Sequence, residues 1–238
     1  AVAGVRKSIK SPNNYLKNNV NGFFNIIETS KNFKIKHFIY ASSSSVYGNS
    51  KKYPVKENNL TDQPESFYAS TKKINEIISY SYSGIYNLPC TGLRFFTVYG
   101  PWGRPDMALF KFVNNILNNK KIDLFNYGNH FRDFTYIDDV VECVYRLINK
   151  PSKLKIPNEI FNISNQKSHN LKNYVKMIEK ELKIKAKVNP LPLQKGDVKK
   201  TYGSVNKLFK FIDYKPKTDI KSGLKNYIEW YKKYYVKC

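Results

Sequence analysis

Short apolar runs alternate along the chain with longer segments in which apolar residues recur every three or four positions. The runs predict strands at residues 36–42, 90–96, 122–125 and 160–164. The longer segments predict helices at residues 13–30, 107–119, 171–182 and 219–235, and two more that are capped by Ser66 and by Asp138 or Asp139. Alternating strands and helices are typical of an α/β fold with a largely parallel sheet.

Two of these helices carry more detailed predictions. The helix after Ser66 is expected to end between residues 84 and 87. In the helix after Asp139, the residues expected to face inward are Val140, Val141, Val144, Leu147 and Ile148. Residues 48–65, 97–106 and 186–203 are expected to be mostly loop, because they are rich in polar residues, Gly and Pro.

Composition argues against several classes of protein. In the 238 residues, no apolar run approaches the roughly 20 residues that a membrane-spanning helix needs. Cys90, Cys143 and Cys238 are odd in number and form no C-x-x-C pair, which argues against a disulfide framework or a zinc site and fits a reducing compartment. The three histidines are widely scattered. We therefore expect a cytoplasmic protein with no membrane partner and no metal ion.

The net charge of +23 could indicate a nucleic-acid partner. The positive charge is almost all lysine, spread along the chain, and no nucleic-acid-binding motif accompanies it. We interpret it as a composition bias and expect no nucleic acid; a nucleic-acid binder is the alternative, and it predicts steeply salt-dependent binding. Arginine is rare here, which suggests that Arg94, Arg104 and Arg132 are used for the planar, bidentate guanidinium group.

Tyr68 and Lys72 are the first candidate catalytic residues. Their spacing places the two side chains one turn apart on one face of the predicted helix. An ammonium group beside a phenol favours the phenolate, so the pKa of Tyr68 would fall and the tyrosine could exchange a proton with an alcohol near neutral pH. The spacing also fits an amphipathic surface aromatic, because the chain has 19 tyrosines and many lysines.

A second element favours the catalytic interpretation. The apolar run at residues 36–42 leads directly into a cluster of hydroxyls at Ser42, Ser43, Ser44 and Ser45. The carboxyl end of a strand is where open α/β folds place their chemistry. The strand and the helix together resemble the extended short-chain dehydrogenase/reductase superfamily, in which a Ser or Thr, a Tyr and a Lys form the active site.

The run Gly92–Lys111 narrows this resemblance. Together with Ala41–Gly48, Tyr68–Lys73 and Arg132–Asp139, it resembles the nucleotide-sugar 4-epimerases, most closely their UDP-glucuronate 4-epimerase branch. The resemblance extends over essentially the whole chain. It implies NAD as the cofactor, a UDP-sugar as the substrate, and a homodimer formed through the Tyr68 helix and the helix near residues 13–30.

The resemblance also implies a role for each matching side chain. Tyr68 would be the catalytic base, Lys72 its pKa-lowering partner and ligand of the nicotinamide ribose, and Ser43 the third catalytic group. Cofactor contacts would fall on Ser42, Tyr68, Lys72 and Phe95. Substrate contacts would fall on Ser44, Ser45, Thr97, Arg104, Arg132 and Asp197. Phe95 and Phe96 could also be simple core, and Asp197 could simply close a turn.

The implied reaction is epimerisation at C4 of a nucleotide sugar through a transient 4-keto sugar, converting UDP-glucuronate to UDP-galacturonate for surface polysaccharide synthesis. In the same superfamily, dehydratases carry an Asp-Glu pair after the position of Ser43, and UDP-xylose-forming decarboxylases carry a Glu. This chain has Ser44 and Ser45 there, which favours epimerisation. The alternatives are a UDP-glucose or UDP-N-acetylglucosamine 4-epimerase and a non-catalytic nucleotide-sugar-binding fragment.

One element of the family pattern is missing. The family begins with a strand and a Gly-x-x-Gly-x-x-Gly loop that holds the pyrophosphate of NAD, and none of the 11 glycines here has that spacing. We expect a partial Rossmann-type sheet without its first strands, in part of a longer polypeptide, and a chain that alone neither holds NAD tightly nor turns over. Residues 1–98 would complete the dinucleotide-binding domain. Residues 99–238 would form mainly a smaller mixed α/β part that binds the nucleotide sugar, with residues 122–148 returning to the Rossmann domain.

Overall fold

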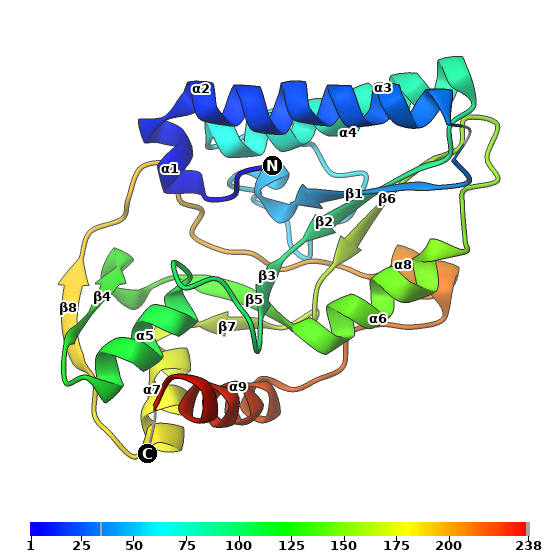
Figure 1. Cartoon of the computed structure of the whole chain (residues 1–238). Coiled ribbons are helices and arrows are strands. Elements are labelled where there is room, and N and C mark those ends of the chain that lie inside the picture. Colours follow the sequence, from blue (N-terminus) through cyan, green and yellow to red (C-terminus); the bar gives the residue numbers. More distant parts are fainter. Residues whose placement is uncertain (34, 237–238) are drawn as a thin grey trace.

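The structure, a computed structural model, describes residues 1–33 and 35–236 and has two parts, each built on its own strands (Figure 1). The first part contains a parallel sheet of β1 (Phe38–Ser43), β2 (Cys90–Phe95) and β6 (Asn158–Ile163), in the order β1-β2-β6. Strands far apart in the sequence therefore lie side by side. Their parallel pairing confirms the predicted α/β class.

Helices cover both faces of this sheet. One face packs against α3 (Gly22–Asn32) and α4 (Phe67–Tyr86), which lie beside each other above the strands in Figure 1. The short helices α1 (Val5–Lys10) and α2 (Pro12–Tyr15) lead into α3 through a π-helical turn. The other face packs against α6 (Ile137–Ile148) and α8 (Asn206–Ile212). Apolar side chains on both faces are what a buried parallel sheet requires.

The second part contains a sheet of β3 (Thr97–Tyr99), β5 (Phe131–Tyr136) and β7 (Ser168–Asn170). A separate parallel pair joins β4 (Lys121–Phe125) to β8 (Lys187–Leu191). Helices α5 (Ala108–Leu117), α7 (Leu171–Leu182) and α9 (Ile220–Tyr235) enclose a buried cluster rich in aromatic side chains. Within that cluster the rings of Phe134 and Tyr174 stack with 4.2 Å between centroids. Within the described ranges, no helix combines the length and the apolar character needed to cross a membrane.

The segment at residues 122–148 divides between the two parts. Helix α6 packs on the first sheet, whereas β4 pairs with β8 and β5 pairs with β3. The predicted helices and the three strands of the first sheet are confirmed to within a few residues. Strands β3, β5, β7 and β8 and helices α1 and α8 were not predicted. Residues 97–106 and 186–203, expected as loop, each contain a short strand, because pairing with a distant strand outweighs their polar or Pro-containing local sequence.

Two predictions for α6 are wrong. Its N-cap is Tyr136. Asp138 and Asp139 lie inside the first turn, where negative charges interact favourably with the helix dipole. The carboxylate of Asp139 accepts hydrogen bonds from the Tyr214 hydroxyl and from the N–H groups of residues 217 and 218. Val141 and Ile148, expected to face inward, are 57% and 50% exposed, because the helical period carries them to the opposite side from the buried residues of α6.

Asp133 on β5 is a buried carboxylate that organises two loops. It is fully buried and accepts hydrogen bonds from the N–H groups of Asn165, at 2.8 Å, and Gly203, at 3.2 Å. Burial raises the pKa of Asp133 to about 7, although these hydrogen bonds act in the opposite direction. Since an aspartate in an unfolded chain has a pKa of about 3.9, the folded protein holds a proton that the unfolded chain has released.

The contribution of Asp133 to the free energy of unfolding should therefore be largest at low pH and be lost as the pH rises towards the folded pKa. Comparison with Asp133→Asn isolates this contribution, because the amide does not titrate. We expect the stability of wild type relative to the variant to fall by on the order of 2 kcal/mol between pH 5 and pH 8. Urea unfolding curves at both pH values measure it, and a difference that does not vary with pH would contradict it.

Candidate active site

A cleft of about 630 Å³ opens beyond the carboxyl ends of β1 and β2 and is lined by both parts of the molecule. Every side chain predicted for the site lines it: Ser42, Ser43, Ser44, Ser45, Tyr68, Lys72, Phe95, Thr97, Arg104, Arg132 and Asp197. The first part contributes the turn after β1, the start of α4 and the end of β2. The second part contributes β3, β5 and two loops. The structure thus gathers into one cavity residues that lie far apart in the sequence.

Local hydrogen bonds fix the start of α4 and with it Tyr68. Ser66 is the N-cap, as predicted, and its hydroxyl accepts a hydrogen bond from the N–H of Ala69 at 3.2 Å. The hydroxyl of Ser8 on α1 accepts a hydrogen bond from the N–H of Tyr68 at 3.1 Å. The rings of Tyr15 and Tyr68 meet edge to face, with 6.2 Å between centroids. The phenol therefore reaches the cleft from a capped and packed helix turn.

The electrostatics at Tyr68 differ from the expectation. Burial raises the pKa of Tyr68, whereas a hydrogen bond from Ser43 and the positive charge of Arg104 lower it. Lys72, expected to lower that pKa, donates a hydrogen bond to the carbonyl oxygen of Ala41 at 2.7 Å, and its ammonium lies 6.0 Å from the centroid of the Tyr68 ring. Burial lowers the pKa of Lys72 itself. The cation that favours the phenolate here is Arg104, which is held on the loop after β3.

The serines after β1 divide between structure and cleft. Ser42 is buried, and its hydroxyl donates to Glu76 Oε1 at 2.6 Å. Ser43 caps a 3-10 turn at residues 44–47, where its hydroxyl oxygen accepts a hydrogen bond from the N–H of Ser45 at 3.2 Å. Ser44 and Ser45 are partly buried and line the cleft. The Ser43 hydroxyl also donates to Ser45 Oγ at 3.1 Å, so the more exposed hydroxyls that line the cleft are those of Ser44 and Ser45.

The aromatic residues at the end of β2 have different surroundings. Phe95 and Thr97 are partly buried and line the cleft. Phe96 also lines it, but its ring belongs to a small core with Val46, Tyr47 and Val55. A Cβ atom at Gly203 would lie 2.4 Å from that ring, so glycine is required for this close approach. Phe96 is thus mainly core, and Phe95 remains a candidate for ligand contact.

Two arginine–aspartate pairs border the cleft. Arg104 makes two hydrogen bonds to Asp106, at 2.9 and 2.6 Å, and its side chain is 45% exposed. Arg132 donates to Asp197 at 2.8 Å, and Arg6 on α1 lies 3.9 Å from the same carboxylate. Asp197 therefore joins the first helix to the second part of the molecule. The two guanidinium groups in the cleft give it the capacity to bind anionic groups of a ligand.

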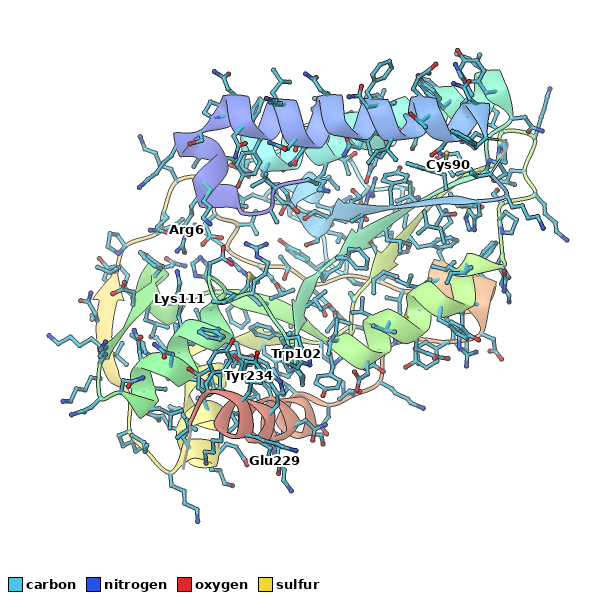
Figure 2. The ribbon with its side chains drawn as sticks, viewed as in Figure 1. Arg6, Cys90, Trp102, Lys111, Glu229 and Tyr234 are labelled. Carbon is cyan, nitrogen blue, oxygen red and sulfur yellow. The ribbon has the colours of Figure 1, made fainter. Side chains whose placement is uncertain are left out.

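Several residues of the cleft were not predicted. Residues 1–5 line it, and the buried side chain of Asn19 ties them to α4 by hydrogen bonds to Val2 and to the hydroxyl of Thr71. Trp102 also lines the cleft and lies beside Tyr234 of α9, with 4.8 Å between ring centroids (Figure 2). A π-helical turn and a tertiary contact position these groups, and no short sequence motif marks either of them.

The described residues fit one end of NAD. Where β1 ends, the cleft combines the buried ammonium of Lys72, the phenol of Tyr68 and the ring of Phe95. Ammonium and phenol suit ribose hydroxyls, and a ring surface suits a nicotinamide. No glycine-rich loop suited to a pyrophosphate occurs in residues 1–33 or 35–236. The fit therefore extends to the nicotinamide-ribose end of the cofactor.

Known proteins match this chain over nearly all its length. Protein CapI of Staphylococcus aureus is 48% identical over 251 residues, which cover 100% of this chain and 75% of CapI. UDP-glucuronate 4-epimerase 4 of Arabidopsis thaliana is 43% identical over 249 residues, covering 99% of this chain and 57% of the plant protein.

A solved structure and a family model agree with these relatives. The crystal structure of UDP-glucuronic acid 4-epimerase from Bacillus cereus, in complex with UDP-glucuronic acid and NAD, superposes with a TM-score of 0.93 at 33% identity, covering 99% of this chain and 74% of that one. The superposition confirms the Rossmann-type fold. Residues 1–164 match the model of the NAD dependent epimerase/dehydratase family. The chain therefore belongs to the NAD dependent epimerase/dehydratase family, among the nucleotide-sugar 4-epimerases that its motifs resemble.

Proposed function

We propose that this protein interconverts UDP-glucuronate and UDP-galacturonate by epimerisation at C4 of the sugar, with NAD as cofactor. The observation that carries the proposal is the cleft itself, which joins Tyr68 and Ser43 to the guanidinium groups of Arg104 and Arg132. Relatives named UDP-glucuronate 4-epimerase support the choice of sugar. Two cationic groups also suit a substrate that carries a diphosphate and a carboxylate.

Each cleft residue has a definite task in this reaction. The phenolate of Tyr68 accepts the proton of the sugar O4 hydroxyl and returns it at the end of the cycle. The hydroxyl of Ser43 and the charge of Arg104 both lower the pKa of Tyr68 and so oppose the effect of burial. Lys72 and Phe95 hold the nicotinamide-ribose end of the cofactor. Bound NAD supplies the acceptance and return of the C4 hydride.

The residues after Ser43 support epimerisation over elimination. Ser44 and Ser45 line the cleft beside the catalytic side chains, and neither can act as the acid that elimination of water requires. Their hydroxyls and that of Thr97 are suited to hydrogen bonds with the sugar. Asp197 accepts a hydrogen bond from Arg132 and so holds this guanidinium group in place to bind the nucleotide.

We also propose a cellular compartment and a pathway for the enzyme. Cys90 and Cys143 are buried and free, which suits a reducing compartment, and we place the enzyme in the cytoplasm on that basis. A nucleotide-activated uronic acid is a donor for glycan synthesis. We therefore propose a role in making surface polysaccharide.

Tyr68→Phe should remove most of the conversion of UDP-glucuronate in the presence of NAD. Loss of the proton-transfer group should lower kcat by about 10²- to 10⁴-fold, while the affinity for UDP changes little because the ring and the cleft remain. Trp102 lines the cleft, so its fluorescence can report UDP binding separately. Tyr80→Phe, at an exposed position of the same helix, is the matched control and should behave as wild type.

Product analysis distinguishes the alternative substrates. The protein is expressed from its own gene and supplied with NAD and each UDP-sugar in turn. We expect kcat/KM to be highest for UDP-glucuronate among UDP-glucuronate, UDP-glucose and UDP-N-acetylglucosamine. A preference for either neutral sugar would overturn the choice of substrate. UDP binding without any NAD-dependent conversion would favour a non-catalytic nucleotide-sugar-binding protein, an alternative that the lack of a glycine-rich loop among the described residues supports.

Ser43→Ala should shift the pH dependence of the reaction. Without its hydrogen bond the pKa of Tyr68 rises further, because burial is then opposed by Arg104 alone. The phenolate would form only at higher pH, so the acidic limb of the kcat/KM profile should move towards higher pH. Ser81→Ala, on the exposed side of α4, is the control. An acidic limb that stays in place in Ser43→Ala would show that Ser43 does not tune Tyr68.

We also propose a homodimer in which α3 and α4 pack against the same helices of a second copy. Large apolar side chains are exposed on these helices: Phe24 is 45%, Ile77 is 55% and Ile85 is 71% exposed. Sedimentation equilibrium should give the mass of a dimer for wild type and of a monomer for Ile77→Glu/Ile85→Glu. Val141→Glu, an equally exposed apolar position on α6, should remain dimeric. A monomeric wild type would contradict the proposal.

A further inference from the structure

The face of α4 that packs on β1 is polar. Apart from Ala69, the fully buried residues of this helix are Thr71, Lys72, Asn75, Glu76, Ser79 and Ser83. A helix that covers a parallel sheet normally buries an apolar stripe. Here Ile78 and Tyr82 supply apolar contacts between α4 and the sheet, whereas Lys72, Glu76 and Ser79 hold β1 through side-chain hydrogen bonds. The same helix carries Tyr68.

These contacts form a seam along the carboxyl-terminal part of β1, from Tyr40 to Ser43. The ammonium of Lys72 donates to the carbonyl oxygen of Ala41, and one turn before it Tyr68 lies near Ser43, which lowers the pKa of the phenol. One turn beyond Lys72 on α4, Glu76 accepts a hydrogen bond from Ser42, and one turn beyond that the hydroxyls of Ser79 and Tyr40 lie 2.6 Å apart. The seam therefore spans about three turns of α4, from Tyr68 to Ser79, and the two catalytic side chains stand at one end of it.

Glu76 and Arg94 form the central contact of the seam. The guanidinium of Arg94 donates to both oxygens of Glu76, each at 2.8 Å, and the two side chains are 4% and 5% exposed. Arg94 also donates to the hydroxyl of Tyr47 at 2.8 Å, and that hydroxyl donates to Asn162 Oδ1 at 2.7 Å.

The sheet presents a polar row to this ion pair. Ser42, Arg94 and Asn162 are register partners across β1, β2 and β6. Ser42 and Arg94 donate hydrogen bonds to Glu76 directly. Asn162 joins the same network through the hydroxyl of Tyr47. Ser43, the catalytic serine, is the next residue after the row, so the network reaches the reacting groups through one peptide bond on β1 and two helix turns on α4.

We infer that Glu76 and Arg94 are positioning residues, which hold Tyr68 and Lys72 at the correct height and rotation relative to Ser43. Apolar side chains tolerate small sliding and rotation of one element against another, whereas a buried bidentate ion pair has one geometry that satisfies both partners. If α4 slid or rotated relative to the sheet, the ion pair would break and the phenol of Tyr68 would move away from Ser43 at the same time. This inference rests on the proposed function, because it assigns Tyr68 and Ser43 a joint catalytic task.

The test is to remove the ion pair without leaving a buried charge. In Glu76→Leu/Arg94→Met both charges are replaced by apolar groups, which proteins often tolerate without loss of stability. Glu159→Leu/Lys207→Met removes an ion pair between β6 of the same sheet and α8, with 2.5 Å between its charged atoms, which does not involve α4. Glu76→Gln is the variant closest in shape: its amide oxygen can still accept from Ser42 and Arg94, but Arg94 keeps a buried charge, so its unfolding is measured alongside.

We expect both double variants to unfold cooperatively near the wild-type midpoint. In Glu76→Leu/Arg94→Met, kcat should fall about 10- to 100-fold with KM for the UDP-sugar within about twofold, as expected for misplacement of the reacting groups. The acidic limb of its pH profile should move to higher pH, because the contact between Ser43 and Tyr68 is weakened. Glu76→Gln should lie between, and the Glu159/Lys207 control should match wild type. Wild-type kcat and pH profile in a folded Glu76→Leu/Arg94→Met protein would overturn the inference.

A second measurement does not depend on turnover. With 13Cζ-labelled tyrosine, the signal of Tyr68 is identified by its absence in Tyr68→Phe, and its titration gives the pKa directly. Arg104, Tyr15 and Lys72, the titratable groups near Tyr68, are unchanged in every variant. A higher pKa in Glu76→Leu/Arg94→Met, or in Glu76→Gln if the double variant does not fold, supports the positioning role; an unchanged pKa refutes it. An inactive wild type would refute the proposed function, while this titration would still decide the role of the ion pair.

Discussion

The buried ion pair between Glu76 and Arg94 is the contact on which the arrangement of the first part depends. Removing one partner would leave a buried charge, which typically costs about 3–5 kcal/mol, a large share of the roughly 5–15 kcal/mol that stabilises a whole domain. Through Tyr47 and Asn162 the same network reaches β6 and the loop near Val55, whose carbonyl oxygen accepts from Asn162. Helix, sheet and loop are therefore fixed by one set of hydrogen bonds.

The second part depends on charged groups in a different way. Among the described residues, Asp133 has no cationic partner and holds two loops through backbone N–H groups. Because its pKa is raised, its contribution to the free energy of unfolding varies with pH. Arg132 and Asp197 lie at the border of the cleft and are partly exposed, which leaves their charges open to a ligand. The protein thus separates a charge pair buried within the first part from charge pairs that lie at the border of the cleft.

Sequence patterns predicted the first sheet and the composition of the cleft but not the contacts between them. β1, β2 and β6 are apolar runs, whereas β7 is Ser-His-Asn and β8 contains Pro190, so their pairing depends on tertiary packing. Tyr68, Lys72 and Ser43 follow from their motif, but the cation near the phenol proved to be Arg104. Arg94 attracted notice because arginine is rare, whereas Glu76 did not, because a glutamate on a helix is typical of an exposed face.

The polar packing of α4 is consistent with the demands of proton transfer. Burial raises the pKa of Tyr68, and one hydrogen bond and one nearby charge oppose it. The hydrogen bond weakens steeply with distance and angle, and the effect of the charge falls with distance, so the balance with burial depends on where the phenol lies. An apolar helix face could supply the burial but not that precision in placement. A seam of directional contacts that ends at Ser43 and Tyr68 supplies both, which explains why a helix over a parallel sheet buries so many polar side chains here.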